Sequence, residues 1–246
     1  PTWSPIERLL ATVTKTIAVM TGGGDCPGLN AAIRTVVRSA TTSYGSRVIG
    51  IADGFEGLIE KRYRELTPGD TRGILRVGGT ILGSSNRTDP WNYTPPGEST
   101  PIDATAAAYE TLDEIGADSL VVIGGDGTLY LTHKFAGGRF PVVGIPKTID
   151  NDIPYVSQSF GYATALERSA EVIRCAHVEA RSVENGVGLV KLMGRHAGFI
   201  AAGASVVSQE VDFTLVPEVP FPLEGENGFL KALERRILNR AHAVIV

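Results

Sequence analysis

A seven-residue segment with the sequence PKTIDND concentrates the residue types that phosphoryl transfer requires. Asp150 and Asp152 provide two carboxylates separated by one residue, and Lys147 and Thr148 precede them with a cation and a hydroxyl. In such a reaction a carboxylate accepts the proton of the attacking hydroxyl, while cations and N–H groups stabilise the phosphoryl oxygens. The structural alternative is a turn in which Asp and Asn side chains bind backbone amides. We expect Asn151 to have that structural role and the aspartates to take part in the chemistry.

Three glycine turns follow apolar segments, a placement that is typical of phosphate binding. They are GGGDCPG at 22–28, GGDGT at 124–128 and MGR at 193–195. Glycine lets backbone N–H groups approach a phosphate without a Cβ in the way, and a following helix adds its positive N-terminal end. One such turn is weak evidence, because glycine also serves ordinary strand-to-helix corners. Three of them in one chain favour a phosphate-bearing ligand.

Two of these turns contain an aspartate, Asp25 and Asp126, at the place where an anionic phosphate is expected. A carboxylate there repels the phosphate unless a Mg²⁺ ion bridges the two. Helix capping is the alternative, since Asp is a preferred capping residue. For Asp126, which stands between two glycines and before Thr128, we favour metal or nucleotide binding. For Asp25 both interpretations stay open.

Apolar strand-like segments alternate with helical segments, which predicts a mostly parallel sheet covered on both faces. The glycine turns and PKTIDND come after strands, where open α/β sheets bind ligands. We expect a leader at 1–14 and two α/β domains at 15–160 and 161–246, with an irregular stretch at 53–97. The expected strands are 16–20, 47–51, 119–123, 141–145, 187–192, 213–217 and 242–246, and the expected helices are 29–41, 106–115, 129–135, 164–182, 199–208 and 228–241.

The composition excludes several classes of protein. The 246 residues are 43% hydrophobic and 20% charged, which is ordinary for a globular chain able to bury a core. A net charge of −4 provides no basic field for nucleic acid or an anionic membrane, and no apolar run approaches the roughly 18 residues of a membrane span. The two cysteines, Cys26 and Cys175, favour a reducing compartment, so we expect a cytoplasmic protein. We interpret Cys26 as a small filler and Cys175 as a core residue.

At this point the sequence resembles a known family. The segments GGGDCPGLNAAIR (22–34), GGDGT, PKTIDND and MGR occur in the order and spacing of the 6-phosphofructokinases, from about Lys15 to the last residue. The resemblance implies two Rossmann-like three-layer domains, the first binding ATP and Mg²⁺ and the second fructose 6-phosphate. It also implies transfer of the ATP γ-phosphoryl group to the sugar 1-hydroxyl, giving fructose 1,6-bisphosphate in glycolysis, by a homo-oligomer (dimer or tetramer).

The resemblance also assigns roles to individual residues. Asp150 would be the base for the 1-hydroxyl, and Asp126 would hold Mg²⁺. Arg34 and Arg38 match arginines that bacterial relatives use for an effector phosphate, and a solvated helix face is the alternative. Thr148 and Asp152 would support the base. The residues that would bind ATP are Gly23, Arg87 (with a one-residue offset), Gly125, Asp126, Gly127 and Thr128. The residues that would contact the sugar phosphate or the transferring group are Lys147, Met193, Gly194 and Arg195.

Two departures from the bacterial pattern concern the phosphoryl donor. Bacterial ATP-dependent enzymes have glycine where this chain has Lys147. Pyrophosphate-dependent relatives have lysine there, and also an aspartate where this chain has Gly127. A carboxylate at position 127 would crowd and repel the α-phosphate of ATP, whereas glycine leaves the space open. Gly127 therefore favours ATP, and the chain is most similar to the plant and trypanosome ATP-dependent branch.

Two further departures concern the sugar phosphate. Gly186 stands where bacterial-type enzymes have an arginine that reaches the sugar phosphate of a neighbouring subunit. Family members also continue past residue 246 with a Glu, a His and arginines that hold the sugar. We therefore expect a C-terminally truncated second domain that binds fructose 6-phosphate poorly.

Other functions remain alternatives. A pyrophosphate-dependent enzyme keeps the fold and changes the donor, and a regulatory subunit would bind phosphosugar without turnover. The intact aspartates at 126, 150 and 152 argue against a regulatory subunit. Diacylglycerol and NAD kinases share GGDGT, but they would not explain PKTIDND followed by MGR. The four histidines lack metal-ligand spacing, so we assign no zinc site.

Overall fold

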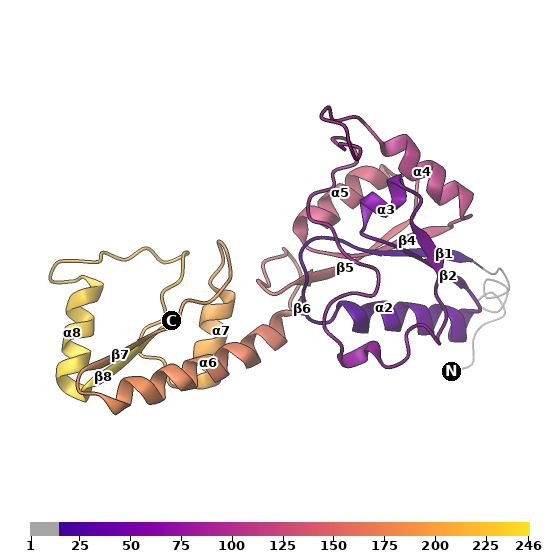
Figure 1. Cartoon of the computed structure of the whole chain (residues 1–246). Helices are drawn as coiled ribbons and strands as arrows, with labels where there is room; N and C mark the ends of the chain where they lie inside the picture. Colours follow the sequence, from indigo (N-terminus) through magenta and orange to yellow (C-terminus); the bar gives the residue numbers. More distant parts are fainter. Residues whose placement is uncertain (1–14) are drawn as a thin grey trace. The chain divides into compact units, whose positions relative to one another are not determined.

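Four apolar strands of the first unit lie side by side and parallel, and a fifth strand runs antiparallel at one edge (Figure 1). The structure, a computed structural model, describes residues 15–246, so the expected leader at 1–14 lies outside the described residues. The strand order is β3-β2-β1-β4-β5. The strands are β1 (Thr16–Thr21), β2 (Arg47–Ile51), β3 (Tyr63–Glu65), β4 (Ser119–Gly124) and β5 (Val142–Thr148).

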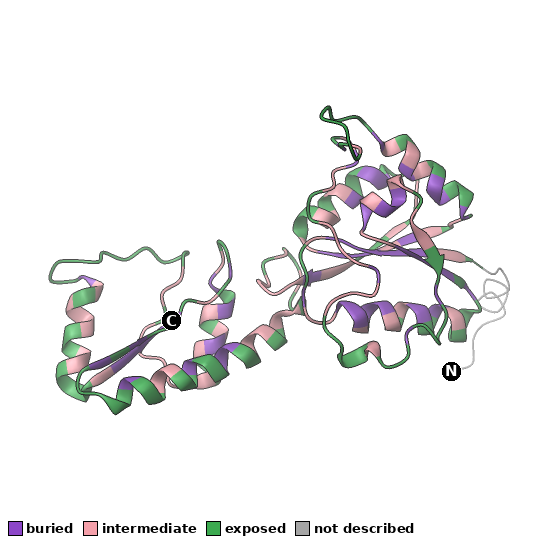
Figure 2. Ribbon diagram, in the orientation of Figure 1, coloured by how far each residue is buried: buried purple, intermediate pink, exposed green. Residues whose placement is uncertain are grey.

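The two faces of this sheet bury alternate residues of the same strands. In β1, Ala18 and Met20 belong to one core cluster and Val19 belongs to the other. This alternation is the period of a β-strand, and both faces are apolar because helices cover both. Figure 2 shows burial concentrated in the central strands and on the side of α2 that faces them. One face is covered by α3 (Phe55–Ile59), α4 (Thr105–Glu114) and α5 (Asp126–Ala136), and the other by α2 (Leu29–Arg38).

The second unit begins at Thr148 and contains a parallel pair of strands, β7 and β8, packed against the long helix α6. Ile173 of α6 is fully buried against Val190 and Val244. A Cβ at Gly186 would lie 2.1 Å from the Ala180 carbonyl oxygen, so the close packing of α6 on β7 requires glycine there. The elements are β6 (Phe160–Gly161), α6 (Tyr162–Ser182), β7 (Gly186–Leu189), α7 (Phe199–Ser208), α8 (Phe229–Arg240) and β8 (His242–Ile245).

Most expected elements are present, and two were predicted with their observed bounds, β2 and α7. The expected strand at 213–217 is wrong, because the segment forms only a single bridge between Phe213 and Ile245. The amides of Asp212 and Phe213 both bond to the Val244 carbonyl, which interrupts a regular ladder. The helix expected at 29–41 gives way after Arg38 to a π-helical turn, Ser39–Ser43. The cysteine expected in the core of the long helix, Cys175, is exposed.

The stretch expected to be irregular, 53–97, contains α3, β3 and a 3₁₀ turn, Ile74–Arg76. The boundary between the two units falls between Lys147 and Thr148, whereas the sequence placed the change near Gly161. Residues 148–160 group with the second unit because their hydrogen bonds are local, such as that from the Ser159 hydroxyl to the Thr148 carbonyl. None of the described helices combines the length and apolarity that a membrane crossing needs.

The contact between Gly22 and Thr128 gives a first test of this packing. A Cβ at Gly22 would lie 2.5 Å from Thr128 Cγ2, so Gly22→Ala should lower the free energy of unfolding by about 1–3 kcal/mol. Thr128→Ser removes Cγ2 and should recover part of that loss in the double variant. Gly127→Ala is the matched control, since nothing lies within 4 Å of its added Cβ. Urea unfolding of the unsubstituted protein, the three single variants and the double variant measures the effect, and strictly additive losses would contradict the assigned contact.

Candidate functional site

The first two glycine turns meet at one edge of the first sheet. Gly22 follows β1 and Gly124 ends β4, and these strands are parallel neighbours. The amide of Gly22 donates to the Ile123 carbonyl at 3.0 Å. A Cβ on Gly22 or Gly124 would lie within 2.6 Å of the Thr128 side chain. The Thr128 side chain therefore packs closely against both glycines. The turns that follow the carboxyl ends of β1 and β4 lie next to each other.

The first turn is fixed by hydrogen bonds to the segment that carries Arg87. The Gly23 amide donates to the Ser85 carbonyl at 3.0 Å, and the Ser84 hydroxyl donates to the Gly23 carbonyl at 2.6 Å. Gly23 has φ +86°, the left-handed region that glycine tolerates best. Gly24 is exposed, with nothing within 4 Å of an added Cβ. Gly24, which the sequence analysis did not single out, is thus the open position of this turn, and only its place in the GGGD run signals it.

The second turn forms the start of α5 rather than a loop before it. The helix expected at 129–135 begins at Asp126, with Gly125 as its N-cap, and no side chain caps this end. The first helical hydrogen bond comes from the Leu129 amide to the Gly125 carbonyl at 2.9 Å. The amides of residues 126–128 precede that bond, and free amides at a helix N-terminus favour an anion. Asp126 and Gly127 are both exposed beside them.

The two aspartates of the glycine turns differ in their surroundings. One carboxylate oxygen of Asp25 accepts the Cys26 amide at 2.9 Å, which favours the local structural role that the sequence left open. Within the described residues, Asp126 has an exposed carboxylate for which no hydrogen bond or ion pair is seen. It is therefore free to receive a cation. No group of three or more His, Cys, Asp or Glu side chains suited to a metal occurs between residues 15 and 246.

Lys147 lies in β5, with its ammonium against the first glycine turn. The sequence placed it in a loop with the aspartates, but β5 extends through Thr148 because Pro146 still pairs with Gly124. The side chain is buried, and Nζ donates to the Gly24 carbonyl at 2.7 Å. Burial lowers the pKa of Lys147, and the nearby Cys26 and Asp25 partly oppose that shift. The ammonium therefore adds positive charge to the edge where the glycine turns meet.

The PKTIDND aspartates stand in the first turn of the second unit, which Asn151 organises. Asn151 adopts φ +54°, and its Oδ1 accepts the Ser159 amide at 2.8 Å. This is the structural role that we expected for Asn151. The Thr148 hydroxyl accepts the Asp150 amide at 3.1 Å, so Thr148 fixes the backbone that carries Asp150. Asp150 is half-buried and Asp152 is exposed.

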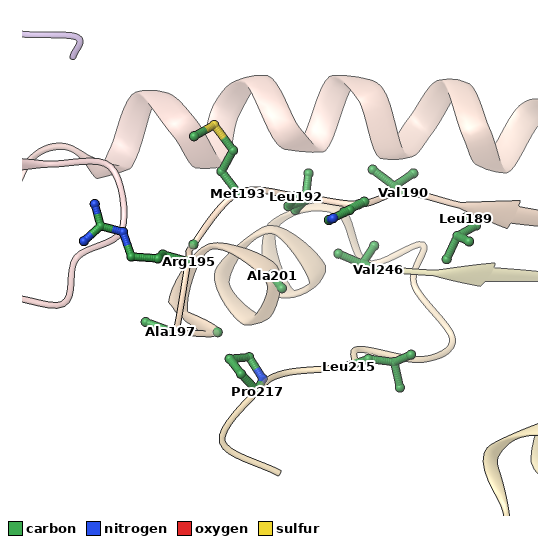
Figure 3. Close-up of a pocket in the computed structure, with 13 residues that line it drawn as sticks. Leu189, Val190, Leu192, Met193, Arg195, Ala197, Ala201, Leu215, Pro217 and Val246 are labelled. Atoms are coloured by element: carbon green, nitrogen blue, oxygen red, sulfur yellow. The ribbon is translucent and has the colours of Figure 1, made fainter. Parts of the chain in front are cut away.

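The MGR turn lies on a cavity of about 330 Å³ in the second unit (Figure 3). Gly194 has φ +145°, and a Cβ there would lie 2.4 Å from the Ala197 carbonyl oxygen. The Ala197 amide closes the turn on the Gly194 carbonyl at 2.8 Å. Figure 3 shows Met193 and Arg195 extending in different directions from this turn, and both side chains are exposed. The turn therefore presents a cation beside an apolar cavity.

Arg87 is exposed close to the first glycine turn. Its amide donates to the Ser85 hydroxyl at 3.3 Å, and Ser85 itself pairs with Gly22 in a parallel bridge. Arg87 also lines a polar cavity of about 320 Å³ together with Glu56 and Glu60. The first unit contains the residues predicted to bind the nucleotide, together with Lys147, which the sequence assigned to the substrate side: Gly23, Arg87, Gly125, Asp126, Gly127 and Thr128. The second unit contains the other residues predicted for the base and the sugar phosphate: Thr148, Asp150, Asp152, Met193, Gly194 and Arg195.

Comparison with known proteins decides the family. The sequence profile of the family described as "Phosphofructokinase" matches residues 16–246. The chain belongs to the phosphofructokinase family. It is 41% identical over 235 residues to ATP-dependent 6-phosphofructokinase 7 of Arabidopsis thaliana, which covers 93% of this chain and 46% of the plant protein. It is 45% identical over 209 residues to the ATP-dependent 6-phosphofructokinase of Mycobacterium bovis, which covers 85% of this chain and 58% of that protein.

Solved phosphofructokinases have the same fold. The structure of phosphofructokinase from Saccharomyces cerevisiae matches with a TM-score of 0.80 and 31% identity, over 94% of this chain and 33% of that chain. A pyrophosphate-dependent phosphofructokinase from Marinobacter aquaeolei matches with a TM-score of 0.77 at 19% identity, over 94% of this chain and 59% of that chain, which bears on the fold alone. The expected mostly parallel α/β architecture is confirmed. The chain spans about half the length of the curated relatives it matches.

The buried ammonium of Lys147 predicts a pH dependence of stability. Because burial lowers its pKa in the folded chain, the unfolded chain holds this proton up to higher pH. The free energy of unfolding should therefore rise with pH between the folded-state pKa and the ordinary lysine pKa of 10.5, and the cost of the buried charge is fully present below that window. Lys147→Met should remove this rise, as followed by urea unfolding from about pH 8 to about pH 10.5.

The matched control is Lys15→Met, which removes an exposed lysine of the same unit. Its pH profile should run parallel to that of the unsubstituted protein. Parallel profiles for Lys147→Met as well would show that Lys147 is not the group responsible.

Proposed function

We propose that this chain carries the donor site and the catalytic base of an ATP-dependent 6-phosphofructokinase, which transfers the γ-phosphoryl group of MgATP to the 1-hydroxyl of fructose 6-phosphate. The observation that carries the proposal is the close packing of Thr128 between Gly22 and Gly124. It brings a glycine turn, a helix N-terminus and a lysine ammonium to one sheet edge. The names of the relatives at 40–45% identity support ATP as the donor.

The first unit supplies charge stabilisation for a polyphosphate. The amides at the start of α5 and the open face of Gly24 offer N–H donors, and Arg87 and Lys147 add positive charge nearby. Such preorganised donors stabilise charge that develops on the transferred group. The exposed carboxylate of Asp126 fits Mg²⁺, which commonly takes one or two protein carboxylates and completes its shell with phosphate oxygens and water. The ion would neutralise phosphate charge when bound with the nucleotide.

The second unit supplies the acceptor chemistry. The Asp150 carboxylate accepts the proton of the sugar 1-hydroxyl as the bond from that oxygen to the γ-phosphorus forms. The bond between the γ-phosphorus and its bridging oxygen breaks, and ADP leaves. Thr148 holds the Asp150 backbone, and Asp152 supports the base through its negative charge. Fructose 6-phosphate would bind at the cavity lined by Met193, Gly194 and Arg195.

The choice of donor rests on the space around Gly127. Nothing lies within 4 Å of an added Cβ there, so an α-phosphate meets no side chain at this point. Lys147, the residue shared with pyrophosphate-dependent enzymes, binds the Gly24 carbonyl. That contact gives Lys147 a structural role that does not depend on which phosphoryl donor is bound. Both observations favour ATP over pyrophosphate.

We further propose a cytoplasmic homo-oligomer, a dimer or tetramer, as the working form. Cys26 and Cys175 are thiols and do not form a disulfide within the described residues, which is consistent with a reducing compartment. One relative is named as chloroplastic, so plastids are a second candidate location. The second unit exposes several large apolar side chains, among them Leu189, Val206 and Leu238, which supports coverage by further protein surface.

A donor assay tests the proposal directly. The purified protein should form fructose 1,6-bisphosphate with MgATP much faster than with pyrophosphate at matched Mg²⁺. Gly127→Asp should reduce the rate with ATP far more than the rate with pyrophosphate, because the new carboxylate projects into the open space beside the α-phosphate. Coupled assays of kcat/KM for both donors give the comparison.

Gly127→Ala is the control for this experiment, since it adds a Cβ without a charge. It should keep the donor preference of the unsubstituted protein. Equal losses with both donors in Gly127→Asp would contradict the steric and electrostatic argument, and a faster reaction with pyrophosphate in the unsubstituted protein would reverse the assignment of the donor.

Removal of the proposed base gives an independent test of the mechanism. Asp150→Ser should lower kcat by about 10²–10⁴-fold, because a general base acts in the transition state. The Kd of MgATP should stay nearly unchanged, since the donor groups lie on other residues. Single-turnover kinetics and calorimetric nucleotide binding measure the two quantities. A kcat that survives the substitution would place the base elsewhere.

A further inference from the structure

Arg62 binds three carboxylates of the short segment that precedes it. Its guanidinium contacts Asp53 at 2.5 Å, Glu56 at 2.7 Å and Glu60 at 2.8 Å. These side chains are only partly exposed, so the cluster carries a local charge excess of two negative charges in a half-buried setting. Such an excess is costly unless the remaining carboxylate oxygens find donors. Glu56 and Glu60 find hydroxyl donors in residues 83–93, the segment that carries Arg87.

Each of the three carboxylate groups reaches that segment. The second oxygen of Glu56 accepts the Thr88 hydroxyl at 3.3 Å, and the Glu60 carboxylate accepts the Tyr93 hydroxyl at 2.5 Å. Burial raises the pKa of Tyr93 to about 12, and Glu60 adds to the shift, so the phenol keeps its proton and donates. A Cβ at Gly83 would lie 2.1 Å from Asp53 Oδ1, which places Asp53 directly against the start of the segment.

The hydrogen bonds beyond Glu56 form a chain with a fixed direction. A carboxylate only accepts, so the Thr88 hydroxyl must donate to Glu56. The Ser85 hydroxyl, which lies 3.0 Å from the Thr88 oxygen, then donates to Thr88. Its oxygen is left to accept the Arg87 amide at 3.3 Å. Each hydroxyl proton of the chain thus points toward Glu56, which leaves the Ser85 oxygen turned to accept the Arg87 amide.

The other side of the same segment holds the first glycine turn. Ser85 accepts the Gly23 amide through its carbonyl, and Ser84 donates to the Gly23 carbonyl. The residue that carries the proposed nucleotide contact is therefore fixed on one side by the glycine turn and on the other by Glu56. None of the groups in this chain of hydrogen bonds is required for the transfer chemistry itself.

We propose that Glu56, held by Arg62 and acting through Thr88 and Ser85, is a positioning residue that sets the backbone of Arg87 beside the first glycine turn for nucleotide binding. The effect on the nucleotide rests on the proposed function, whereas the effect on the segment does not. Glu56 acts through Arg87 and makes no contact with the nucleotide.

A double-mutant cycle on MgATP affinity tests the coupling. Glu56→Gln keeps the size of the side chain, but it cannot accept both Arg62 and Thr88 with its single oxygen. We expect Glu56→Gln to raise the Kd of MgATP by about 3- to 10-fold, the scale of one hydrogen bond in the chain. Arg87→Ala should raise the Kd as well, and the double variant should bind no more weakly than Arg87→Ala alone. Thr88→Val should reproduce Glu56→Gln, and Thr88→Ser should restore the affinity.

Glu114→Gln is the matched control, because Glu114 likewise binds a cation, Lys61, and a phenol, Tyr63, in the same unit. It should leave the Kd of MgATP unchanged. Additive effects of Glu56→Gln and Arg87→Ala, or an equal loss in Glu114→Gln, would overturn the proposal in favour of a general effect on stability.

A second measurement needs no nucleotide and separates this proposal from the proposed function. Trypsin cleaves after Arg87, and a fixed backbone resists cleavage. Glu56→Gln should be cut there several-fold faster than the unsubstituted protein, and Glu114→Gln should not. Unchanged cleavage after Arg87 in Glu56→Gln would overturn the positioning role. Failure of the unsubstituted protein to bind MgATP, with cleavage behaving as expected, would instead refute only the proposed function.

Discussion

The packing of Thr128 between two glycines is the constraint on which the donor site depends. Any side chain on Gly22 or Gly124 would collide with Thr128, and the start of α5 would then have to move away from the ends of β1 and β4. A helix N-terminus contributes to anion binding only within its first turn, so a displacement of one or two ångströms matters. Leu129, the next residue of α5, packs in the same close manner on Gly144 of β5. Glycine at positions 22, 124 and 144 thus brings the start of one helix down onto three neighbouring strands.

Lys147 shows how the same edge tolerates a buried charge. Its ammonium loses hydration, and the fall in its pKa records that cost, but the Gly24 carbonyl and the nearby Asp25 and Cys26 compensate in part. A lysine in this place shapes the glycine turn and contributes positive charge without being a donor-specific contact. The two positions whose donor signatures conflict in the sequence therefore differ in the structure, since Lys147 contacts the Gly24 carbonyl and Gly127 borders open space.

Helices and strands could be predicted from the sequence where a local pattern of apolar residues defines them. They could not be predicted where contacts with residues distant in the sequence determine the local structure. Apolar runs bounded by glycine predicted β1, β2 and β4, and α7 was predicted with its observed bounds. The stretch from 53 to 97 gave no periodic signal, because its buried apolar residues, such as Phe55, Leu58 and Leu82, are widely spaced and the polar residues between them are held by Arg62 and its carboxylates. The start of α5 was missed for a related reason, since glycine at 125 and 127 is unfavourable in a helix until Thr128 is seated. The residue types of the candidate site could be read from the sequence, but the partner of Lys147 required the fold.

The register of β5 links these observations. Gly124 pairs with Pro146, so Lys147 and Thr148 are the last residues of the strand, and their side chains point to opposite faces. That alternation sends the lysine to the glycine turn and leaves Thr148 to bind the Asp150 amide. A slip of one residue would exchange the two, burying a threonine under Gly24 and removing the hydroxyl that fixes the proposed base. Because Gly144 must also receive Leu129, the register is set by a packing contact three residues before the lysine. The direction in which Lys147 leaves the strand is therefore determined by the same glycine packing that fixes the start of α5.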